Sequence, residues 1–330
     1  MAKQDISLLP GISVIVPVYN GSATLGELVI RLEAVLSNVA DRFELVLVND
    51  GSPDDSWEVL SQLSESHPSI QAINLMQNYG QHNALLCGIR AASYDVIVTM
   101  DDDLQHPPEE IPKLLAVLGQ GFDVVYGTPE REQHGVLRDW ASWVTKIALQ
   151  GAMGAEIARR VCAFRAFRAQ VANASHHYDG SFVSIDVLLT WGTNRFGAVP
   201  VRHDRRQRGV SGYTFRKLFT HTMNMMTGFS TLPLQIASLV GFVFTLFGFG
   251  ILCYVLSRYL VYGSPVPGFP FLASIIAIFS GAQLFALGII GEYLARMHFR
   301  TMSRPSYAVR ETARHAGVLP RSSAAASKSG

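Results

Sequence analysis

Residues Val98–Glu110 read VTMDDDLQHPPEE, and they join an apolar run to three consecutive aspartates, Asp101, Asp102 and Asp103. A glutamine, a histidine and two prolines follow before a helical pattern can begin. Three adjacent carboxylates at the end of a buried strand repel one another unless a positive charge lies beside them. The stretch therefore indicates a bound cation at the edge of a hydrophobic core.

The spacing of these carboxylates suits a divalent metal ion. Asp101 and Asp103 flank one residue, so in an extended segment their side chains lie on the same side of the chain. Two such carboxylates suit Mg²⁺ or Mn²⁺, which keep water ligands and bind jointly with substrate phosphates. A solvated acidic loop is the alternative, and these residues alone leave both possibilities open.

The first half of the chain alternates short apolar runs with helical patterns, which predicts a parallel α/β sheet with helices on both faces. In such sheets ligands bind beyond the carboxyl ends of the strands, where Asn20, Asp50 and Asp101 are expected to lie. The expected strands are residues 12–16, 43–48, 70–75, 95–100 and 122–127, and the expected helices are residues 25–36, 53–66, 82–92 and 108–120.

Composition narrows the class of protein. The 330-residue chain has a formal net charge of +1, which does not indicate a nucleic-acid partner. Hydrophobic residues make up 48% and charged residues 16%, and the apolar excess lies mostly after about residue 222, which predicts a membrane part. The three cysteines are far apart and argue against a disulfide framework. The N-terminus lacks a hydrophobic signal region, so we expect the first domain to stay in the cytoplasm.

Two stretches without formal charge, residues 232–256 and 269–291, exceed the roughly 20 apolar residues that cross a bilayer. We expect transmembrane helices at about 232–257 and 269–294, with a buried hairpin in a soluble protein as the alternative. The connector at residues 261–270 carries no Lys or Arg, whereas basic residues flank both stretches. Arg258, near the outer end of the first stretch, is the exception and could extend its side chain to the membrane surface. By the positive-inside rule both chain ends face the cytoplasm at the inner membrane, and the link faces outward.

The remaining segments carry weaker signals. Residues 134–150 and 213–228 each suit either a core-facing helix or an interfacial helix in the headgroup layer. The chain from about Glu311 onward is rich in Ala and Ser and is expected to lack a fixed structure. The expected parts are a cytoplasmic α/β domain over residues 1–228, a membrane hairpin over residues 229–296 and a cytoplasmic tail over residues 297–330.

Four motifs occur in order along the expected sheet: SVIVPVYN at 13–20, VNDGSPDDS at 48–56, NYGQHNALLCG at 78–88 and DDDLQHPPEEIPKLL at 101–115. Together they resemble the family-two glycosyltransferases, which implies a GT-A fold with a Rossmann-like, mixed but mainly parallel sheet. A later GxSxY element at Gly209–Tyr213, the two apolar spans and a Gly-Glu-Tyr at Glu292 resemble the polyprenyl-phosphate glycosyltransferases. The undecaprenyl-phosphate branch of that group is the most similar.

The resemblance implies a role for each residue at the strand ends. Asp101 would contact the ribose or a metal-bound water, and Asp101, Asp103 and Gln105 would hold Mg²⁺ or Mn²⁺ at the diphosphate. A divalent ion neutralises the charge that builds on the leaving nucleoside diphosphate, so Asp101 and Asp103 would be the catalytic residues. The other residues around the base and ribose would be Pro17, Tyr19, Asn20, Asp50 and Asp102.

The implied acceptor is a phosphate monoester, an anion near neutral pH that needs positive charge to hold it more than it needs a general base. A basic flank that contacts anionic lipid is the other interpretation for each arginine. The residues expected at the acceptor phosphate are Arg131, Arg138, Arg206, Arg208 and Ser211. The histidines expected to be structural or solvated are His82, His106 and His134.

The chain departs from the family pattern at several positions. Asn49 stands where the family usually has Asp, Gly21 where it has Glu, and Gly212 where it has Lys. Arg159 and Arg160 occupy the place of an aspartate that usually precedes the Phe-Arg-Ala segment. These departures leave open an altered acceptor geometry or reduced activity.

The expected function is the inverting transfer of one sugar from a nucleotide sugar, by resemblance a UDP-sugar, to undecaprenyl phosphate at the cytoplasmic membrane face. The resemblance also suggests a homo-oligomer, namely a tetramer. A processive polysaccharide synthase is a rival, although two spans offer no obvious channel. A non-catalytic membrane scaffold that keeps the fold and binds a nucleotide sugar is the other, and the sequence leaves the identity of the sugar open.

Overall fold

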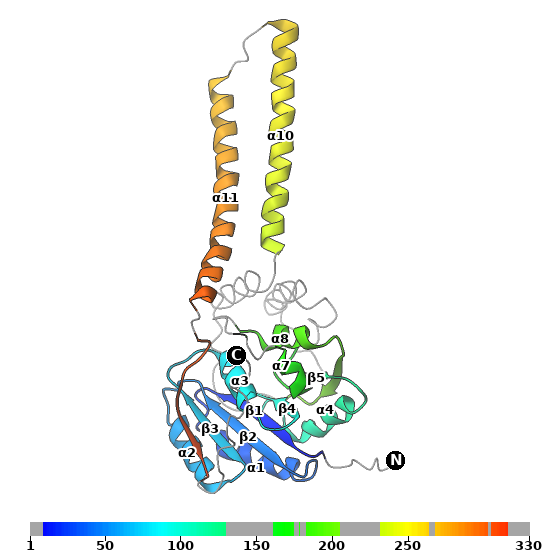
Figure 1. The fold of residues 1–330 in the computed structure, drawn as a ribbon, viewed down its shortest axis with the longest axis vertical. Helices are drawn as coiled ribbons and strands as arrows, with labels where there is room; N and C mark the ends of the chain where they lie inside the picture. Colours follow the sequence, from blue (N-terminus) through cyan, green and yellow to red (C-terminus); the bar gives the residue numbers. More distant parts are fainter. Residues whose placement is uncertain are drawn as a thin grey trace, which may run out of the picture. The chain divides into compact units, whose positions relative to one another are not determined.

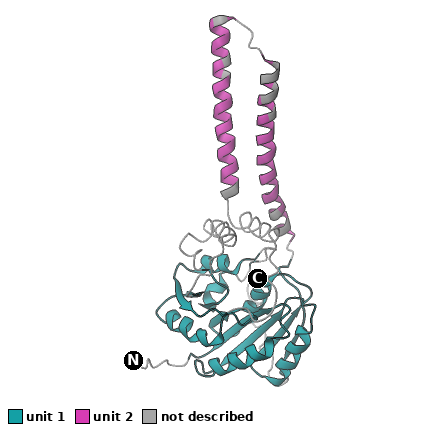
Figure 2. Cartoon of the chain, turned by 180° about the vertical axis from the view of Figure 1, so that it is seen from behind, with its two compact units in different colours: residues 1–135, 156–212, 305–330 teal, residues 136–155, 213–304 magenta. Residues whose placement is uncertain are grey.

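The computed structural model describes residues 9–129, 161–174, 178, 183–204, 232–263, 268–302 and 305–315. The chain divides into two compact units, drawn in teal and magenta in Figure 2. The first comprises residues 1–135, 156–212 and 305–330, and the second comprises residues 136–155 and 213–304. The helices expected at residues 134–150 and 213–228 lie outside the described residues.

Over the described residues, the first unit contains a mixed eight-stranded sheet with the strand order β7-β5-β6-β4-β1-β2-β3-β8 (Figure 1). The pairs β1–β2, β1–β4, β2–β3 and β5–β7 are parallel, whereas β6 and β8 run antiparallel to their neighbours. The strands are β1 (Ile12–Val18), β2 (Phe43–Asn49), β3 (Ile70–Leu75), β4 (Val96–Thr99), β5 (Val124–Pro129), β6 (Arg165–Arg168), β7 (Phe196–Val201) and β8 (Val309–Arg314).

Helices cover both faces of this sheet, as the alternating pattern predicts. Side chains alternate along a strand, so in β1 Val14 and Val16 face one hydrophobic core and Ile15 faces the other. The first core packs against α1 (Leu25–Leu36), α2 (Ser56–Ser66) and α4 (Ile111–Leu118), which follows the 3-10 turn η1 (Pro108–Glu110). The second core packs against α3 (Gln81–Ala91), α7 (Ala169–Asn173) and α8 (Ile185–Gly192).

The strands and helices expected in the first half are confirmed, with small shifts at their ends. The start of α2 is shifted from Pro53 to Ser56. Asp54 accepts hydrogen bonds at 3.3 Å from the amides of Ser22 and Ser56, and these contacts hold the preceding residues in a turn. The turn held by the Asp54 side chain therefore occupies the residues where the first turn of the helix was expected.

Strand β6 brings a charged side chain into the core. Arg165 is 1% exposed and forms an ion pair with Asp186 of α8, which also accepts a hydrogen bond from Tyr126 Oη at 3.1 Å. Arg165 Nε donates to Thr99 Oγ1 at 2.9 Å, at the end of β4. These partners offset the cost of burying the guanidinium. They also connect β4, β5, β6 and α8 beside the aspartates that follow β4.

The end of the chain corrects one expectation. Residues Val309–Arg314 form β8, which pairs antiparallel with β3 and is the brown strand beside it in Figure 1. The expectation that the chain lacks a fixed structure from about Glu311 is therefore wrong for Glu311–Arg314. Backbone hydrogen bonds to the edge of β3 order this polar strand, and composition does not reveal such bonds. Residues 316–330 lie outside the described part of the chain.

The second unit contains two long apolar helices, α10 (Leu232–Tyr262) and α11 (Phe269–Thr301). Both are long and apolar enough to cross a membrane by length and composition, which supports the expectation of two such helices. Each continues past the expected end, because polar residues that follow an apolar stretch do not stop a helix. The two helices contact each other where the rings of Phe244 and Phe279 meet edge to face at 5.7 Å.

The buried ion pair yields a stability prediction. Asp186→Asn should lower the free energy of unfolding by about 3–5 kcal/mol, because it leaves the Arg165 guanidinium buried without its counter-ion. Arg168→Ala removes the exposed pair with Asp123, 3.9 Å apart, and should cost at most about 1 kcal/mol. Chemical denaturation of the detergent-solubilised protein measures both, and equal losses would contradict the prediction.

Candidate active site

The loops that follow β1, β2, β3 and β4 meet at one edge of the sheet, because the carboxyl ends of parallel neighbours lie side by side. Backbone contacts fix their positions: Asp50 N donates to Val18 O at 2.9 Å, and Met100 N donates to Ile15 O at 3.2 Å. Asn20, Asp50 and Asp101 therefore follow neighbouring strands, as the sequence predicts.

Three successive backbone amides after β1 are each held by a side chain from elsewhere, namely from the loop after β4, the loop after β2 and the start of α2. Tyr19 N donates to Asp102 Oδ2 at 3.3 Å, Asn20 N to Ser52 Oγ at 3.2 Å and Gly21 N to Ser56 Oγ at 3.0 Å. Asn20 has a φ of 57°, the left-handed conformation that asparagine tolerates better than most residues. The side chain of Tyr19 remains 49% exposed and available to a ligand.

Gly21 explains how Asp102 reaches this loop. A Cβ atom on Gly21 would lie 2.4 Å from Asp102 Oδ2, so any side chain at residue 21 would displace the carboxylate. The glycine that departs from the family pattern is thus matched to the position of Asp102 in this chain. Asp102 can therefore occupy its present position only with glycine at residue 21.

Asp50 joins the loops after β2 and β3. It is 3% exposed and accepts the amides of Tyr79 at 2.7 Å and Gly80 at 2.9 Å. Burial raises the pKa of Asp50 above its usual value, and the two N–H donors oppose that rise. Gly51 has a φ of 63°, and a Cβ there would lie 2.5 Å from Asn78 N, so this close approach requires glycine.

The three aspartates do not continue as an extended strand. Strand β4 ends at Thr99, Asp102 and Asp103 lie in a turn, and Leu104 is buried with a φ of 58°. The simple alternation that places Asp101 and Asp103 on one side therefore does not apply here. Asp101 Oδ1 accepts a hydrogen bond from Gln81 Nε2 at 2.6 Å, which links the cluster to α3.

Asp102 and Asp103 have different surroundings within this turn. Asp103 Oδ1 accepts the amide of Gln105 at 3.1 Å. Burial, together with the charges of Asp101 and Asp103, raises the pKa of Asp102 to about 7, although the Tyr19 amide opposes the rise. Asp102 is therefore disfavoured in its charged form, and it accepts a hydrogen bond from the β1 loop.

The donor set suits a metal shared with a substrate. No group of three or more His, Cys, Asp or Glu side chains among the residues the structure describes is arranged to hold a metal. Mg²⁺ and Mn²⁺ are commonly bound by one or two carboxylates together with phosphate oxygens and water. Asp101 and Asp103 meet that requirement at the turn, and their ligation of a metal together with Gln105 remains a prediction.

His106 packs behind the aspartates. Its ring stacks on Phe164 with centroids 5.3 Å apart and meets His203 edge-on at 4.8 Å, while its Nε2 lies 3.5 Å from Cys162 Sγ. Burial and the neighbouring His203 lower the pKa of His106 to about 4, so the ring is neutral at physiological pH. This is the structural role expected of His106.

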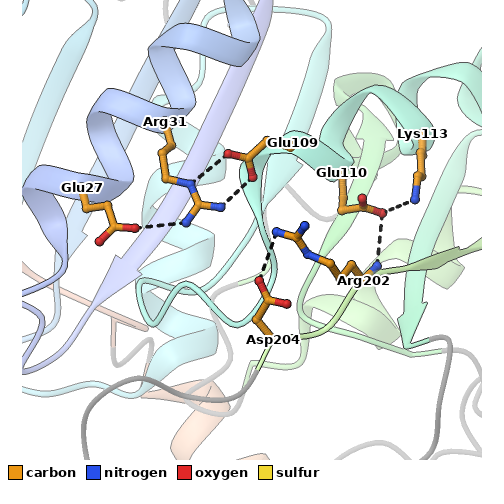
Figure 3. Close-up of polar contacts among 7 residues, drawn as sticks. All are labelled: Glu27, Arg31, Glu109, Glu110, Lys113, Arg202 and Asp204. Carbon is orange, nitrogen blue, oxygen red and sulfur yellow. Dashed lines mark hydrogen bonds and ion pairs between the residues drawn. The ribbon is translucent and has the colours of Figure 1, made fainter.

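Charged side chains anchor the segment that follows the aspartates (Figure 3). Glu109 of η1 makes a two-pronged contact with Arg31 of α1, at 2.9 and 2.7 Å. Glu110 lies 2.5 Å from Lys113 Nζ and accepts the amide of Arg202 at 3.2 Å. These contacts hold the prolines and η1 between α1 and the end of β7.

The structure thus gathers most of the residues predicted for the donor side. Pro17 is buried inside β1, whereas Tyr19 and Asn20 are exposed at its end. Ser52 and Ser56 were missed, although both lie within the VNDGSPDDS motif. The residues predicted for the acceptor phosphate, together with the two arginines in place of the family aspartate, lie outside the described ranges; they are Arg131, Arg138, Arg159, Arg160, Arg206, Arg208 and Ser211.

Comparison with known proteins places this site in a family. The model for "Glycosyl transferase family 2" matches residues 13–175. The undecaprenyl-phosphate 4-deoxy-4-formamido-L-arabinose transferase of Pseudomonas savastanoi pv. phaseolicola is 35% identical over 306 residues, covering 92% of this chain and 91% of the relative. The chain belongs to glycosyl transferase family 2. The enzyme of the same name from Klebsiella pneumoniae is 34% identical to this glycosyltransferase over 308 residues, covering 92% of this chain and 94% of the relative.

Solved structures confirm the fold class of the glycosyltransferase. Glucosyl-3-phosphoglycerate synthase from Mycobacterium tuberculosis, in complex with Mn²⁺, uridine diphosphate and glucosyl-3-phosphoglycerate, superposes with a TM-score of 0.51. The match has 17% sequence identity and covers 66% of this chain and 78% of that chain. At this identity the likeness concerns the GT-A-like fold alone.

The environment of Asp102 predicts a pH dependence in the metal-free glycosyltransferase. Its folded-state pKa of about 7 lies above the usual 3.8, so the protonated carboxyl stabilises the fold below about pH 4, and this contribution is lost as the pH rises through about 7. Asp102→Asn, which stays neutral, should therefore melt at a higher temperature than wild type at about pH 8 and at the same temperature at about pH 4.

Thermal unfolding in EDTA across this pH range measures the effect. Glu58→Gln, on the exposed side of α2, is the matched control, since it also removes one carboxylate. A difference between Asp102→Asn and wild type that stays constant with pH would contradict the assigned pKa.

Proposed function

We propose that this glycosyltransferase transfers a single sugar from a nucleotide sugar to undecaprenyl phosphate at the cytoplasmic face of the membrane, with inversion at the anomeric carbon. The observation that carries the proposal is the 35% identity over 92% of the chain to a transferase whose acceptor is undecaprenyl phosphate. At that coverage the match extends over the two apolar helices and most of the sheet. A lipid acceptor requires an enzyme held at a membrane, and α10 and α11 suit that requirement.

On the donor side, the exposed Tyr19 and Asn20 and the loop fixed by Asp50 would receive the base and ribose. Asp101 and Asp103 would face the diphosphate and share a Mg²⁺ or Mn²⁺ ion with it. When bound, the ion supplies positive charge that stabilises the departing nucleoside diphosphate. Hydrogen bonds between the loops fix the positions of Asn20 and Asp50, and a site held in this way costs little to orient the donor.

On the acceptor side, an oxygen of the lipid phosphate attacks the anomeric carbon while the bond from that carbon to the diphosphate oxygen breaks. A single in-line displacement inverts the configuration, and the attacking oxygen carries its own negative charge. The groups proposed to hold this phosphate are Arg131, Arg138, Arg206, Arg208 and Ser211. The first donors to test are UDP-linked forms of 4-deoxy-4-formamido-L-arabinose, the sugar in the names of the relatives.

Turnover by the purified full-length protein tests this function. With undecaprenyl phosphate, Mn²⁺ and a panel of nucleotide sugars, one donor should give a lipid-linked sugar. Asp103→Asn should lower that turnover on the order of 100-fold or more, because the metal and diphosphate lose a negative ligand. Glu58→Gln serves as the control, with turnover near wild type. Nucleotide-sugar binding without turnover for any donor would instead favour the non-catalytic scaffold.

The proposed topology places both chain ends in the cytoplasm and the link between α10 and α11 outside. A cysteine introduced at Ser264, in that link, should react with a membrane-impermeant thiol reagent in intact cells. A cysteine introduced at Ser22 should react only after the cells are opened. The parent protein gives the background from Cys87, Cys162 and Cys253, and the reverse labelling pattern would rule out the cytoplasmic site.

A further inference from the structure

A chain of hydrogen bonds links the C-terminal strand to the loop after β1. Glu311 Oε1 accepts from Asn74 Nδ2 at 3.0 Å, and Asn74 Oδ1 accepts from Asn49 Nδ2 at 2.9 Å. Asn49 Oδ1 accepts the backbone amide of Ser52 at 3.3 Å, and Ser52 Oγ accepts the amide of Asn20 at 3.2 Å. Asn49 and Asn74 are 2% and 5% exposed, so their amide groups depend on these partners.

This hydrogen-bond relay from Glu311 through Asn74 and Asn49 to Ser52 has a direction that is fixed at both ends, because the Glu311 carboxylate only accepts and the Ser52 backbone amide only donates. A carboxylate accepts hydrogen bonds and does not donate them, so Asn74 must turn its NH₂ group towards Glu311. Asn74 then presents its oxygen to Asn49, and Asn49 presents its own oxygen to Ser52. Each of the two asparagine side chains donates a hydrogen bond towards β8, at the edge of the sheet, and accepts one from the side of the donor loop. The two buried amides next to the donor loop can therefore satisfy the Ser52 amide only because an exposed residue of β8, Glu311, accepts at the other end.

The geometry of β8 supports this function for Glu311. Asn74 and Glu311 are direct partners across the strands, and the register shifts immediately beyond them, between Asn74 and Leu75. Such bulges re-aim side chains and are common next to active sites. The strand is held at both ends, because Arg310 Nη2 donates to Met76 O at 3.0 Å and His315 Nδ1 lies 2.7 Å from Glu65 O.

We propose that Glu311 is a positioning residue of the nucleotide-sugar site, which acts through Asn74, Asn49 and Ser52 to hold the backbone at Asn20 in its left-handed conformation. The inference rests on the proposed function in taking the Tyr19–Asn20 loop as part of the donor site. The relay itself belongs to one compact unit and depends only on contacts within it.

The polarity of the relay can be reversed, and this gives the test. Asn49→Asp cannot donate to Asn74, so Asn74 must either face it with an oxygen or turn around and face Glu311 with one. Glu311→Gln alone still accepts from Asn74. In the double variant Asn49→Asp/Glu311→Gln, the glutamine donates to Asn74 and Asn74 donates to the new aspartate, so both side-chain hydrogen bonds are restored in the opposite direction while residue 49 still accepts the Ser52 amide.

We expect Asn49→Asp to raise the donor KM about fivefold to tenfold with little change in kcat, as the loss of one hydrogen bond implies. The double variant should return the donor KM to within about twofold of the wild-type value. Hydrogen–deuterium exchange of peptides covering residues 17–24 should be faster in Asn49→Asp and return to the wild-type rate in the double variant. His315→Ala, which loosens the far end of β8 without touching the relay, is the matched control.

The exchange measurement needs no turnover, so it decides the relay even if no nucleotide sugar is transferred and the proposed function fails. If the double variant exchanges as fast as Asn49→Asp, the relay does not transmit polarity and the proposal is wrong. If His315→Ala reproduces the effect, general loosening of β8 explains it and the proposal is again wrong. Restored exchange without restored donor KM would separate the loop from the donor site and overturn the assignment of Glu311.

Discussion

The backbone amides of Tyr19, Asn20 and Gly21 set the geometry on which the strand-end site depends. They follow the last residue of a buried strand, and each is held by a side chain from the loop after β4, the loop after β2 or the start of α2. Because unpaired amides near a core are costly, the loops after β1, β2 and β4 must adopt their positions together. A glycine at residue 21 makes room for the closest of these contacts.

Much of this arrangement follows from local sequence. The alternation of apolar runs and helical patterns gives the central strands and their helices, and the polar residues at strand ends identify the edge where the site lies. The aspartate cluster shows where sequence reasoning stops. Alternation holds only while the chain is extended, and the turn at Asp102 and Asp103 ends it, so Asp102 contacts the β1 loop.

Other features depend on residues far apart in the chain, which spacing alone does not pair. Arg165 appears in the sequence as one more basic residue, and only the fold shows that it is buried with Asp186. Asn74 and Glu311 are likewise brought together by the pairing of β3 with β8. Polar residues of this kind carry no hydrophobic signal, and their partners are set by the topology of the sheet.

The position of β8 in the chain also determines when the sheet can finish folding during synthesis. The strand follows α11 in the chain, so a ribosome releases both long apolar helices before the last strand of the sheet. Until then the edge of β3 has no partner at residues 71–75, and Asn74 lacks the carboxylate that orients it. The site at the strand ends is therefore finished only after the apolar hairpin has been made, which couples maturation of the sheet to synthesis of the segment suited to the membrane.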